Sequence, residues 1–260
     1  MACVHGIQYL AIQDLAKDFN SAPAASISRS ADHGKTWTWD RSRPMFEGGV
    51  FTTITFLDFG KDGANAPDDF IYAYGLDGNW RDSFNDAVPD PADLFLARAP
   101  TASVQDRSTW QFFSGLTDGA PRWSSDIEAK QAVLHDDRHL YVDADPATAH
   151  NLTVISQGGV VYDKPLKRFL YTSWTELTFE FYEAEHPGGP FRLFFSKDWG
   201  PYPWTAEKQG GYGLSIPSKF IDPAGQSMWL QSNVCPCAPA GTSSYDFSLR
   251  RLELSPSAAP

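Results

Sequence analysis

The sequence of 260 residues predicts an all-β fold, a β-propeller of the five-bladed type with about three and a half to four blades visible. Three observations predict it. A turn motif typical of propeller blades lies at residues 30–37. Twenty Gly and nineteen Pro are spread along the chain, as expected for many short strands joined by turns. Strand-like segments recur in groups, and the later groups each begin at a Gly-Gly pair.

The turn motif reads Ser-Ala-Asp-His-Gly-Lys-Thr-Trp and fits S-x-D-x-G-x-T-W, the pattern of an Asp box. We expect the Asp32 carboxylate to accept hydrogen bonds from backbone N–H groups that follow it. Gly34 supplies the positive φ of a tight turn, and Trp37 opens the next strand. An Asp box joins the two outer strands of a blade and belongs to the scaffold. An ordinary Asp/Gly hairpin is the alternative interpretation.

The strand-like segments fall into four groups along the chain. The first group holds residues 7–15 and 24–31; the second holds 51–59, 70–75, 93–99 and 110–114. The third holds 160–163, 168–173, 177–183 and 191–195, and the fourth holds 216–221, 227–231 and 245–254. We therefore predict a single propeller domain over residues 1–260. Its blade units cover approximately residues 1–46, 47–118, 157–198 and 209–254, with a long inserted loop at 119–156.

Paired glycines mark the start of the later units. They are Gly48-Gly49, Gly158-Gly159 and Gly210-Gly211. A pair without side chains lets the backbone pass close to the crowded centre of a propeller. Three unrelated Gly-Gly loops are the alternative.

Composition and charge exclude several partners. The net charge of −11 and the pI near 4.9 argue against nucleic acid and anionic membrane as partners, whereas neutral polysaccharide is compatible. Aromatic residues make up 14% of the chain, which suits stacking on sugar rings as well as packing between blades. No apolar run is long enough to span a membrane. The first ten residues lack the pattern of a signal peptide, so we predict none in this chain.

The sequence predicts no metal site and no cofactor. His135 and His139 have the i, i+4 spacing of a helical zinc pair. Their flanks read as extended chain, which separates the two imidazoles. A calcium ion, which some sugar-active propellers hold in the channel, has no residues here that locate it.

Several stretches resemble a bacterial and fungal propeller family catalogued as a domain of unknown function and related to endo-D-arabinanase glycoside hydrolases. The resembling stretches are the Asp box and residues 51–56, 69–75, 93–98, 106–110, 121–124, 161–170 and 217–220. The resemblance implies a secreted, extracellular five-bladed propeller that acts on or binds carbohydrate. The strand at 7–15 takes the place of a second strand in its blade, so we expect this sequence to lack the N-terminal blade of the family. The family's catalytic acids have no matching positions here.

Propeller topology predicts which loops carry the site. Loops between the second and third strands of a blade and between successive blades gather on one face, and the Asp box lies on the other. Segments 46–50, 76–92, 115–157, 173–177, 196–213 and 231–244 are thereby assigned to the functional face. The substrate-binding candidates on this face are aromatic or guanidinium side chains: Trp80, Arg81, Arg122, Trp123, Trp174, Trp199, Trp204 and Tyr212. Packing within the blades is the alternative role for each aromatic ring.

Glycoside hydrolysis needs two carboxyl groups, one protonated and one ionised. The catalytic candidates are Asp126, Glu128 and Glu176. Asp126 and Glu128 occupy alternate positions of a segment expected to be extended, so they point the same way. Glu176 follows Trp174 in a short loop, where apolar contact raises a carboxyl pKa. Glu180 and Glu183 belong to a strand and are expected to face solvent between blades.

Two functional classes follow. The first is a glycoside hydrolase-like enzyme that cuts polysaccharide, with arabinan as the substrate that the resemblance indicates, through paired carboxylates. The second is a non-catalytic glycan-binding propeller, or a pseudoenzyme left by truncation. In either class we expect a monomer whose partner is a poly- or oligosaccharide.

Overall fold

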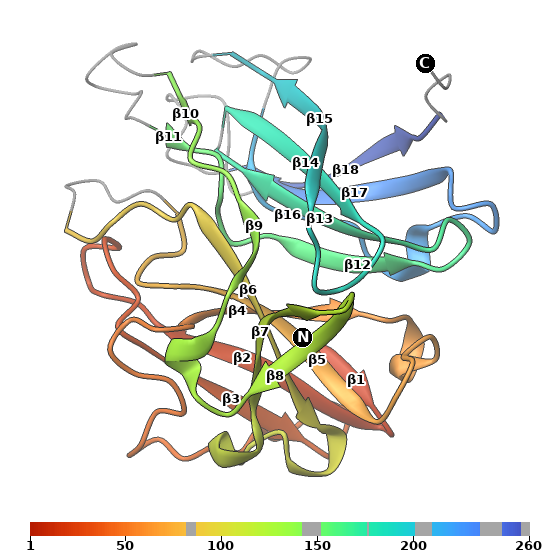
Figure 1. Cartoon of the computed structure of the whole chain (residues 1–260). Coiled ribbons are helices and arrows are strands. Elements are labelled where there is room, and N and C mark those ends of the chain that lie inside the picture. Colours follow the sequence, from red (N-terminus) through yellow and green to blue (C-terminus); the bar gives the residue numbers. More distant parts are fainter. Residues whose placement is uncertain (82–86, 142–151, 176, 201–209, 235–245, 256–260) are drawn as a thin grey trace.

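The computed structural model describes residues 1–81, 87–141, 152–175, 177–200, 210–234 and 246–255 (Figure 1). Within these residues the chain forms strands and short 3₁₀-helices and no α-helix. The predicted fold class, an all-β partial propeller, is confirmed. No helix in the described ranges is long and apolar enough to cross a membrane.

The strands form four groups, which we call blades 1 to 4. Blade 1 contains β1 (Ala2–Val4), β2 (Ile7–Asp14) and β3 (Ala24–Ser30). Blade 2 contains β4 (Thr53–Asp58), β5 (Phe70–Leu76), β6 (Asp93–Pro100), β7 (Gln111–Thr117) and β8 (Ala120–Ser124), and β9 (Ala132–His135) pairs with β6. Blade 3 contains β12 (Gly159–Asp163), β13 (Arg168–Trp174), β14 (Thr178–Ala184) and β15 (Arg192–Asp198). Blade 4 contains β16 (Tyr212–Ser215), β17 (Ser227–Val234) and β18 (Asp246–Glu253).

Short elements connect the blades. β10 (His139–Leu140) and β11 (Leu152–Thr153) form a separate two-stranded pair. The 3₁₀-helices are η1 (Lys61–Gly63), η2 (Thr101–Ser103), η3 (Arg107–Thr109), η4 (Ile127–Ala129) and η5 (Ser218–Phe220). Neighbouring strands within each blade are antiparallel, but β4 and β12 are parallel, with Leu57 opposite Val160. The first strands of blades 2 and 3 therefore lie side by side, as inner strands of a propeller do, and β8 and β15 lie at the two ends of the joined sheet.

Three apolar cores lie between successive blades. The core between blades 1 and 2 contains Ile27, Phe51 and Trp110 among its buried side chains. The core between blades 2 and 3 contains Tyr74 and Tyr171, and other buried residues join blades 3 and 4. Each inner blade therefore has two buried faces, which explains why its strands read as nearly continuous apolar runs.

Alternation along single strands supplies both faces. In β5, Ile71 and Ala73 belong to the core on the blade 1 side, whereas Tyr72 and Tyr74 belong to the core on the blade 3 side. Successive side chains of a strand point to opposite faces, so one short segment packs against two neighbours at once. Position 75 of this strand requires glycine, because a Cβ there would lie 2.5 Å from the Phe51 ring.

The turn at residues 30–37 is held by its own side chains. The Thr36 backbone N–H donates to the Asp32 carboxylate at 2.9 Å, and the Thr36 hydroxyl donates to it at 2.7 Å. These bonds and one from the Ser30 hydroxyl lower the pKa of Asp32 to about 2. Gly34 has the positive φ expected of it, 81°. The expected contact of Asp32 with following N–H groups is therefore present.

Two of the paired glycines make close backbone contacts. A Cβ at Gly158 would lie 1.7 Å from the Thr172 carbonyl oxygen, and a Cβ at Gly211 would lie 2.6 Å from that of Asn233. Both positions exclude any side chain. The backbone just before β12 and β16 therefore passes so close to the neighbouring strand that only glycine is accommodated there.

The strands that were predicted for blades 1 to 3 are present, but β1 was not predicted, and β8 to β11 lie in the stretch 119–156 that was expected to be a loop. The strand predicted at residues 216–221 is wrong. The first strand of blade 4 is β16 (Tyr212–Ser215), and Ser218–Phe220 form η5. Pro217 lies between the two and cannot donate a ladder hydrogen bond, so the chain leaves the sheet there.

Candidate functional site

Three of the predicted substrate-binding residues form a row of rings where strand ends of blades 2, 3 and 4 meet. Trp80 follows β5, Trp174 ends β13 and Tyr212 begins β16. The Trp80 and Trp174 ring centroids are 5.8 Å apart, and those of Trp174 and Tyr212 are 5.6 Å apart. We call these three residues the aromatic row.

The exposure of the rings differs along the row. Trp174 is 2% exposed and packs in the core between blades 3 and 4. Trp80 and Tyr212 are half-buried on either side of it. Trp174 therefore lies inside the core, whereas Trp80 and Tyr212 pack against that core and keep part of their surface exposed.

Backbone hydrogen bonds fix the row. The Gln157 N–H donates to the Trp80 carbonyl at 2.6 Å, and the Trp174 indole N–H donates to the Gln157 carbonyl at 2.5 Å. The Trp80 indole N–H donates to the Phe19 carbonyl at 3.3 Å. Arg81 is buried, with its guanidinium carbon 5.1 Å from the Trp80 ring centroid. The segment after β5 is therefore tied to blade 1 and to the entry of blade 3.

A second aromatic–cation contact lies beside the row. The Trp199 ring lies 5.5 Å from the Phe179 ring, and the guanidinium carbon of Arg250 lies 4.5 Å from the Trp199 centroid. Burial lowers the pKa of Arg250, whose Nη2 donates to the Gly210 carbonyl. The sequence singled out Trp199 but not Arg250, because its strand reads as a solvated outer strand.

Arg122 and Trp123 do not join the row. They lie on β8 at one end of the ten-stranded sheet. The Trp123 ring packs 6.1 Å from Tyr72 and 6.2 Å from Phe113, and Arg122 Nη2 donates to the Ser114 carbonyl. Trp123 therefore packs against the core between blades 2 and 3.

Asp126 and Glu128 also lie away from the row, in the turn after β8. The segment was expected to be extended, and this is wrong: Asp126 caps η4, and its carboxylate accepts the Glu128 N–H at 3.0 Å. Both side chains are exposed. An Asp side chain that bonds the backbone two residues on favours a turn over a strand, which explains the difference. Glu176 and Trp204 lie outside the described residues.

The expectation that Glu180 faces solvent is wrong. Glu180 is 0% exposed, and its carboxylate accepts bonds from Arg138 Nη2 at 3.1 Å and the Ser196 hydroxyl at 2.7 Å. Arg138 also pairs with Asp136 at 2.8 Å. Burial alone raises the pKa of Asp136, but the hydrogen bonds from Arg138 and Tyr182 and the charge of Arg138 together outweigh burial, so the pKa lies below its ordinary value. The β10 segment thus brings Arg138 onto a buried carboxylate of blade 3.

His135 and His139 are separated, as their extended flanks predict. His135 ends β9 and its Nδ1 lies 2.8 Å from Asp93, whereas His139 begins β10 and its Nε2 lies 3.5 Å from Asp90. The bond to Asp93 raises the pKa of His135. Among the described residues, no group of three or more His, Cys, Asp or Glu side chains is arranged to hold a metal ion.

Comparison with known proteins gives a fold match. No family model and no curated protein matches the chain. A thermostable family-43 glycoside hydrolase superposes with a TM-score of 0.52 at 11% identity, over 98% of this chain and 70% of that one. The chain has the fold of that hydrolase.

Two further solved structures are more distant. Zg3597, a family 117 glycoside hydrolase from Zobellia galactanivorans, gives a TM-score of 0.43 at 12% identity over 98% of this chain and 68% of its own. A candidate exo-beta-1,3-galactanase from Bifidobacterium bifidum s17 gives 0.37 at 15% identity over 75% of this chain. The chain spans 48% of that galactanase and 31% of another glycoside hydrolase.

Proposed function

We propose that this propeller binds a neutral poly- or oligosaccharide through the aromatic row. The observation that carries the proposal is the arrangement of Trp80, Trp174 and Tyr212, in which one buried ring holds two half-buried rings in place. Rings of this kind offer a flat apolar surface with a polar edge, which suits the C–H face and hydroxyl groups of a sugar.

Charge supports a neutral glycan. The net charge of −11 repels polyanions, and the fold is that of a family-43 glycoside hydrolase. Arabinan is the first glycan to test, because of the resemblance to endo-D-arabinanase relatives. We further propose that the protein acts outside the cell and as a monomer.

Affinity electrophoresis in gels that contain arabinan, xylan or galactan tests the binding. Trp80→Ala and Tyr212→Ala each remove a half-buried ring, and we expect each to weaken the affinity read from the retardation by about fivefold, since one aromatic contact contributes on the order of 1 kcal/mol. Trp229→Ala is the matched control, because this ring is 43% exposed on β17 and outside the row. Equal retardation of all variants contradicts the proposal.

Hydrolysis through paired carboxylates is the second candidate function, favoured by the hydrolase fold. Asp126, Glu128 and Glu176 are its proposed catalytic groups. If they act, Asp126→Asn, Glu128→Gln and Glu176→Gln each lower oligosaccharide release from arabinan by a factor of about 100 or more. The two described carboxylates are exposed in a turn at the outer part of blade 2, which supports binding without cleavage. Binding without release identifies a lectin-like protein or pseudoenzyme, and release that survives all three substitutions excludes this assignment.

A further inference from the structure

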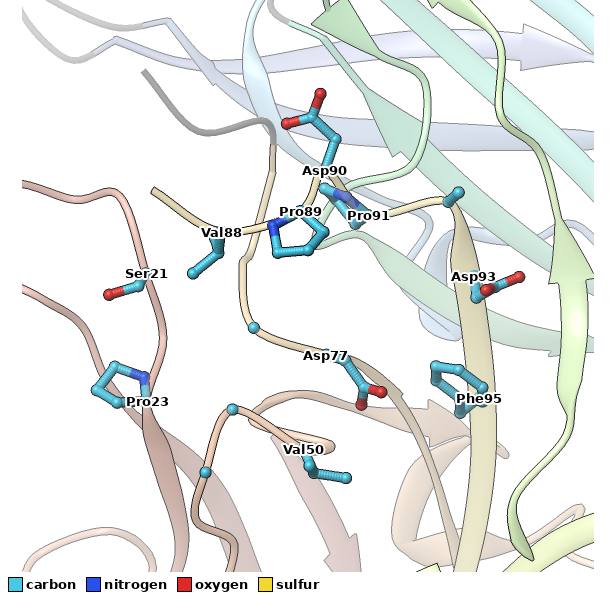
Figure 2. Close-up of a pocket in the computed structure, with 14 residues that line it drawn as sticks. Ser21, Pro23, Val50, Asp77, Val88, Pro89, Asp90, Pro91, Asp93 and Phe95 are labelled. Atoms are coloured by element: carbon cyan, nitrogen blue, oxygen red, sulfur yellow. The ribbon is translucent and has the colours of Figure 1, made fainter. Parts of the chain in front are cut away.

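A cavity of about 580 Å³ lies beside the segment that carries Trp80, between loops of blades 1 and 2 (Figure 2). Its volume falls in the range of small-molecule sites, about 300–1,000 Å³. The apolar part of its wall is formed by Pro23, Val50, Val88, Pro89, Pro91 and Phe95. Gly78, two residues before Trp80, also lines it, so the cavity and the aromatic row lie on two parts of the same loop.

Backbone hydrogen bonds between three segments build one side of the cavity. The Gly49 N–H donates to the Pro23 carbonyl at 3.0 Å, the Gly78 N–H donates to Gly49 at 2.5 Å, and the Ala22 N–H donates to Gly78 at 2.7 Å. A Cβ at Gly49 would lie 3.3 Å from the Gly78 Cα. The cavity is therefore preformed, which lowers the entropy cost of binding.

Asp77 supplies a fixed carboxylate in the wall. It accepts the Phe51 N–H at 2.7 Å and pairs with the Lys130 ammonium at 3.0 Å. The Asp77 side chain is 39% exposed, whereas Lys130 is 9% exposed and lies 4.6 Å from the Phe95 ring centroid. Two contacts hold the carboxylate, and its remaining lone pairs are available to a hydroxyl donor from a ligand.

The other two carboxylates of the lining turn away. Figure 2 shows the Asp90 and Asp93 side chains pointing away from the space between Val50 and Val88. Their partners are His139 at 3.5 Å and His135 at 2.8 Å. Asp77 is the carboxylate of the described lining that faces Val50 and Phe95 (Figure 2), and a single carboxylate there suits a neutral hydroxyl-bearing ligand and not an anion. The same arrangement lacks the facing pair that glycoside hydrolysis requires.

We propose that this cavity is a second saccharide-binding site, in which a sugar hydroxyl donates to Asp77 and the C–H face of the ring packs on the proline and phenylalanine wall. The inference rests on the proposed glycan-binding function but concerns a different group of residues. Both sites follow β5, so they bind neighbouring stretches of the same glycan.

Protein-detected NMR with arabinotriose as the probe separates the two sites. The backbone amides of Gly49 and Gly78 report on the cavity, and the indole N–H of Trp80 reports on the row. We expect both sets of signals to shift, each with its own saturation curve. Val88→Trp fills the cavity and is expected to reduce the affinity read from the glycine amides at least about tenfold, with the Trp80 response retained. Val50→Phe is a second filling variant. Leu116→Trp, at a site that is 51% exposed on β7, is the matched control.

The outcomes distinguish the inference from the proposed function. A Trp80 shift without glycine shifts overturns the second site and leaves the proposed function standing. Glycine shifts that both filling variants leave unchanged also overturn it, provided that the two variants retain the wild-type spectrum elsewhere. A spectrum unchanged by arabinotriose, and by the xylan and galactan trisaccharides, overturns both the second site and the proposed function.

Discussion

Replacement of Arg138 by Met tests whether the β10 segment is held on blade 3 by charge. Arg138 Nη2 lies 2.8 Å from Asp136 and 3.1 Å from Glu180, and Glu180 is 0% exposed. Removal of the guanidinium leaves the Glu180 carboxylate with the hydrogen bond that the Ser196 hydroxyl donates to it. A buried ion pair that loses one partner typically costs about 3–5 kcal/mol, because the remaining charge is buried without compensation.

The structure places the expected cost somewhat below that range. The Arg138 side chain is 39% exposed, so water can replace part of its contact with the carboxylates. We expect the free energy of unfolding to fall by about 2–3 kcal/mol, which corresponds to a Tm lower by roughly 4–12 °C for a chain of this size. Urea denaturation followed by tryptophan fluorescence measures the free energy, and calorimetry measures the Tm.

Arg168→Met is the matched control. Arg168 pairs with Glu183 at 3.6 Å and Glu185 at 3.2 Å, but these partners are 46% and 70% exposed. A surface pair of this kind contributes about 0–1 kcal/mol. If Arg138→Met costs no more than Arg168→Met, the argument from burial is refuted. The double variant Arg138→Met/Glu180→Met also removes the buried carboxylate, and we expect it to recover part of the loss, because Asp136 still lacks its guanidinium partner.

The same variant has a predictable pH dependence. The pKa of Asp136 is depressed in the folded protein by its bonds to Arg138, although burial opposes this. A depressed carboxyl pKa contributes stability that is present above the ordinary Asp value, about 4, and is lost as the pH falls through the folded value. The difference in stability between wild type and Arg138→Met therefore narrows as the pH falls below about 4. A difference that grows on acidification contradicts the assignment.

Three further predictions concern the scaffold. Trp110→Ala removes a ring that is 0% exposed and donates to the Val104 carbonyl, and we expect a loss of about 3–5 kcal/mol by urea denaturation. Asp32→Ala removes the acceptor of the Thr36 N–H. Because the pKa of Asp32 is lowered to about 2, we expect the wild-type amide to be protected from hydrogen exchange above the ordinary Asp pKa and to lose this protection toward pH 2. The variant lacks the protection at every pH. Burial raises the pKa of Asp163, so the folded state favours its neutral form; Asp163→Asn raises the Tm at pH 7, and the gain vanishes below the ordinary Asp value.

Most of the fold could be predicted because its strands are buried on both faces. In β4, Ile54 and Phe56 pack in the core toward blade 1 and Leu57 packs in the core toward blade 3, so burial on both faces selects strand-forming apolar residues there. The strand predictions fail where a side chain changes the hydrogen bonding of the backbone, so that no strand ladder forms. Asp126 caps a turn, and Pro217 ends the sheet before Ser218–Phe220 form η5. Both errors follow from reading alternation without asking which backbone groups the side chains bind.

The site could be predicted by its loops more readily than by its contacts. Topology placed Trp80, Trp174 and Tyr212 on one face, although they are far apart in the sequence, and the structure brings their rings together. Topology also placed Trp123 there. A side chain in a strand such as β8 can lie on either face of the sheet, and the Trp123 ring lies on the face that packs against the core. The partners of Glu180 were unpredictable because Arg138 reaches it from a connecting segment with no fixed register to β14.

The two candidate sites depend on one strand. β5 ends at Leu76, which is 1% exposed, and the next residues are Asp77 in the cavity wall and Trp80 in the aromatic row. Because β5 is buried against blade 1 on one face and blade 3 on the other, the segment after it leaves the sheet from a rigid position. The hydrogen bonds from Gly78 to Gly49 and from Gln157 to Trp80 then fix this segment to the entries of blades 2 and 3. The cores between the blades therefore fix the separation of the two sites. A glycan that contacts both sites binds groups that are already held in place by the packing of β5.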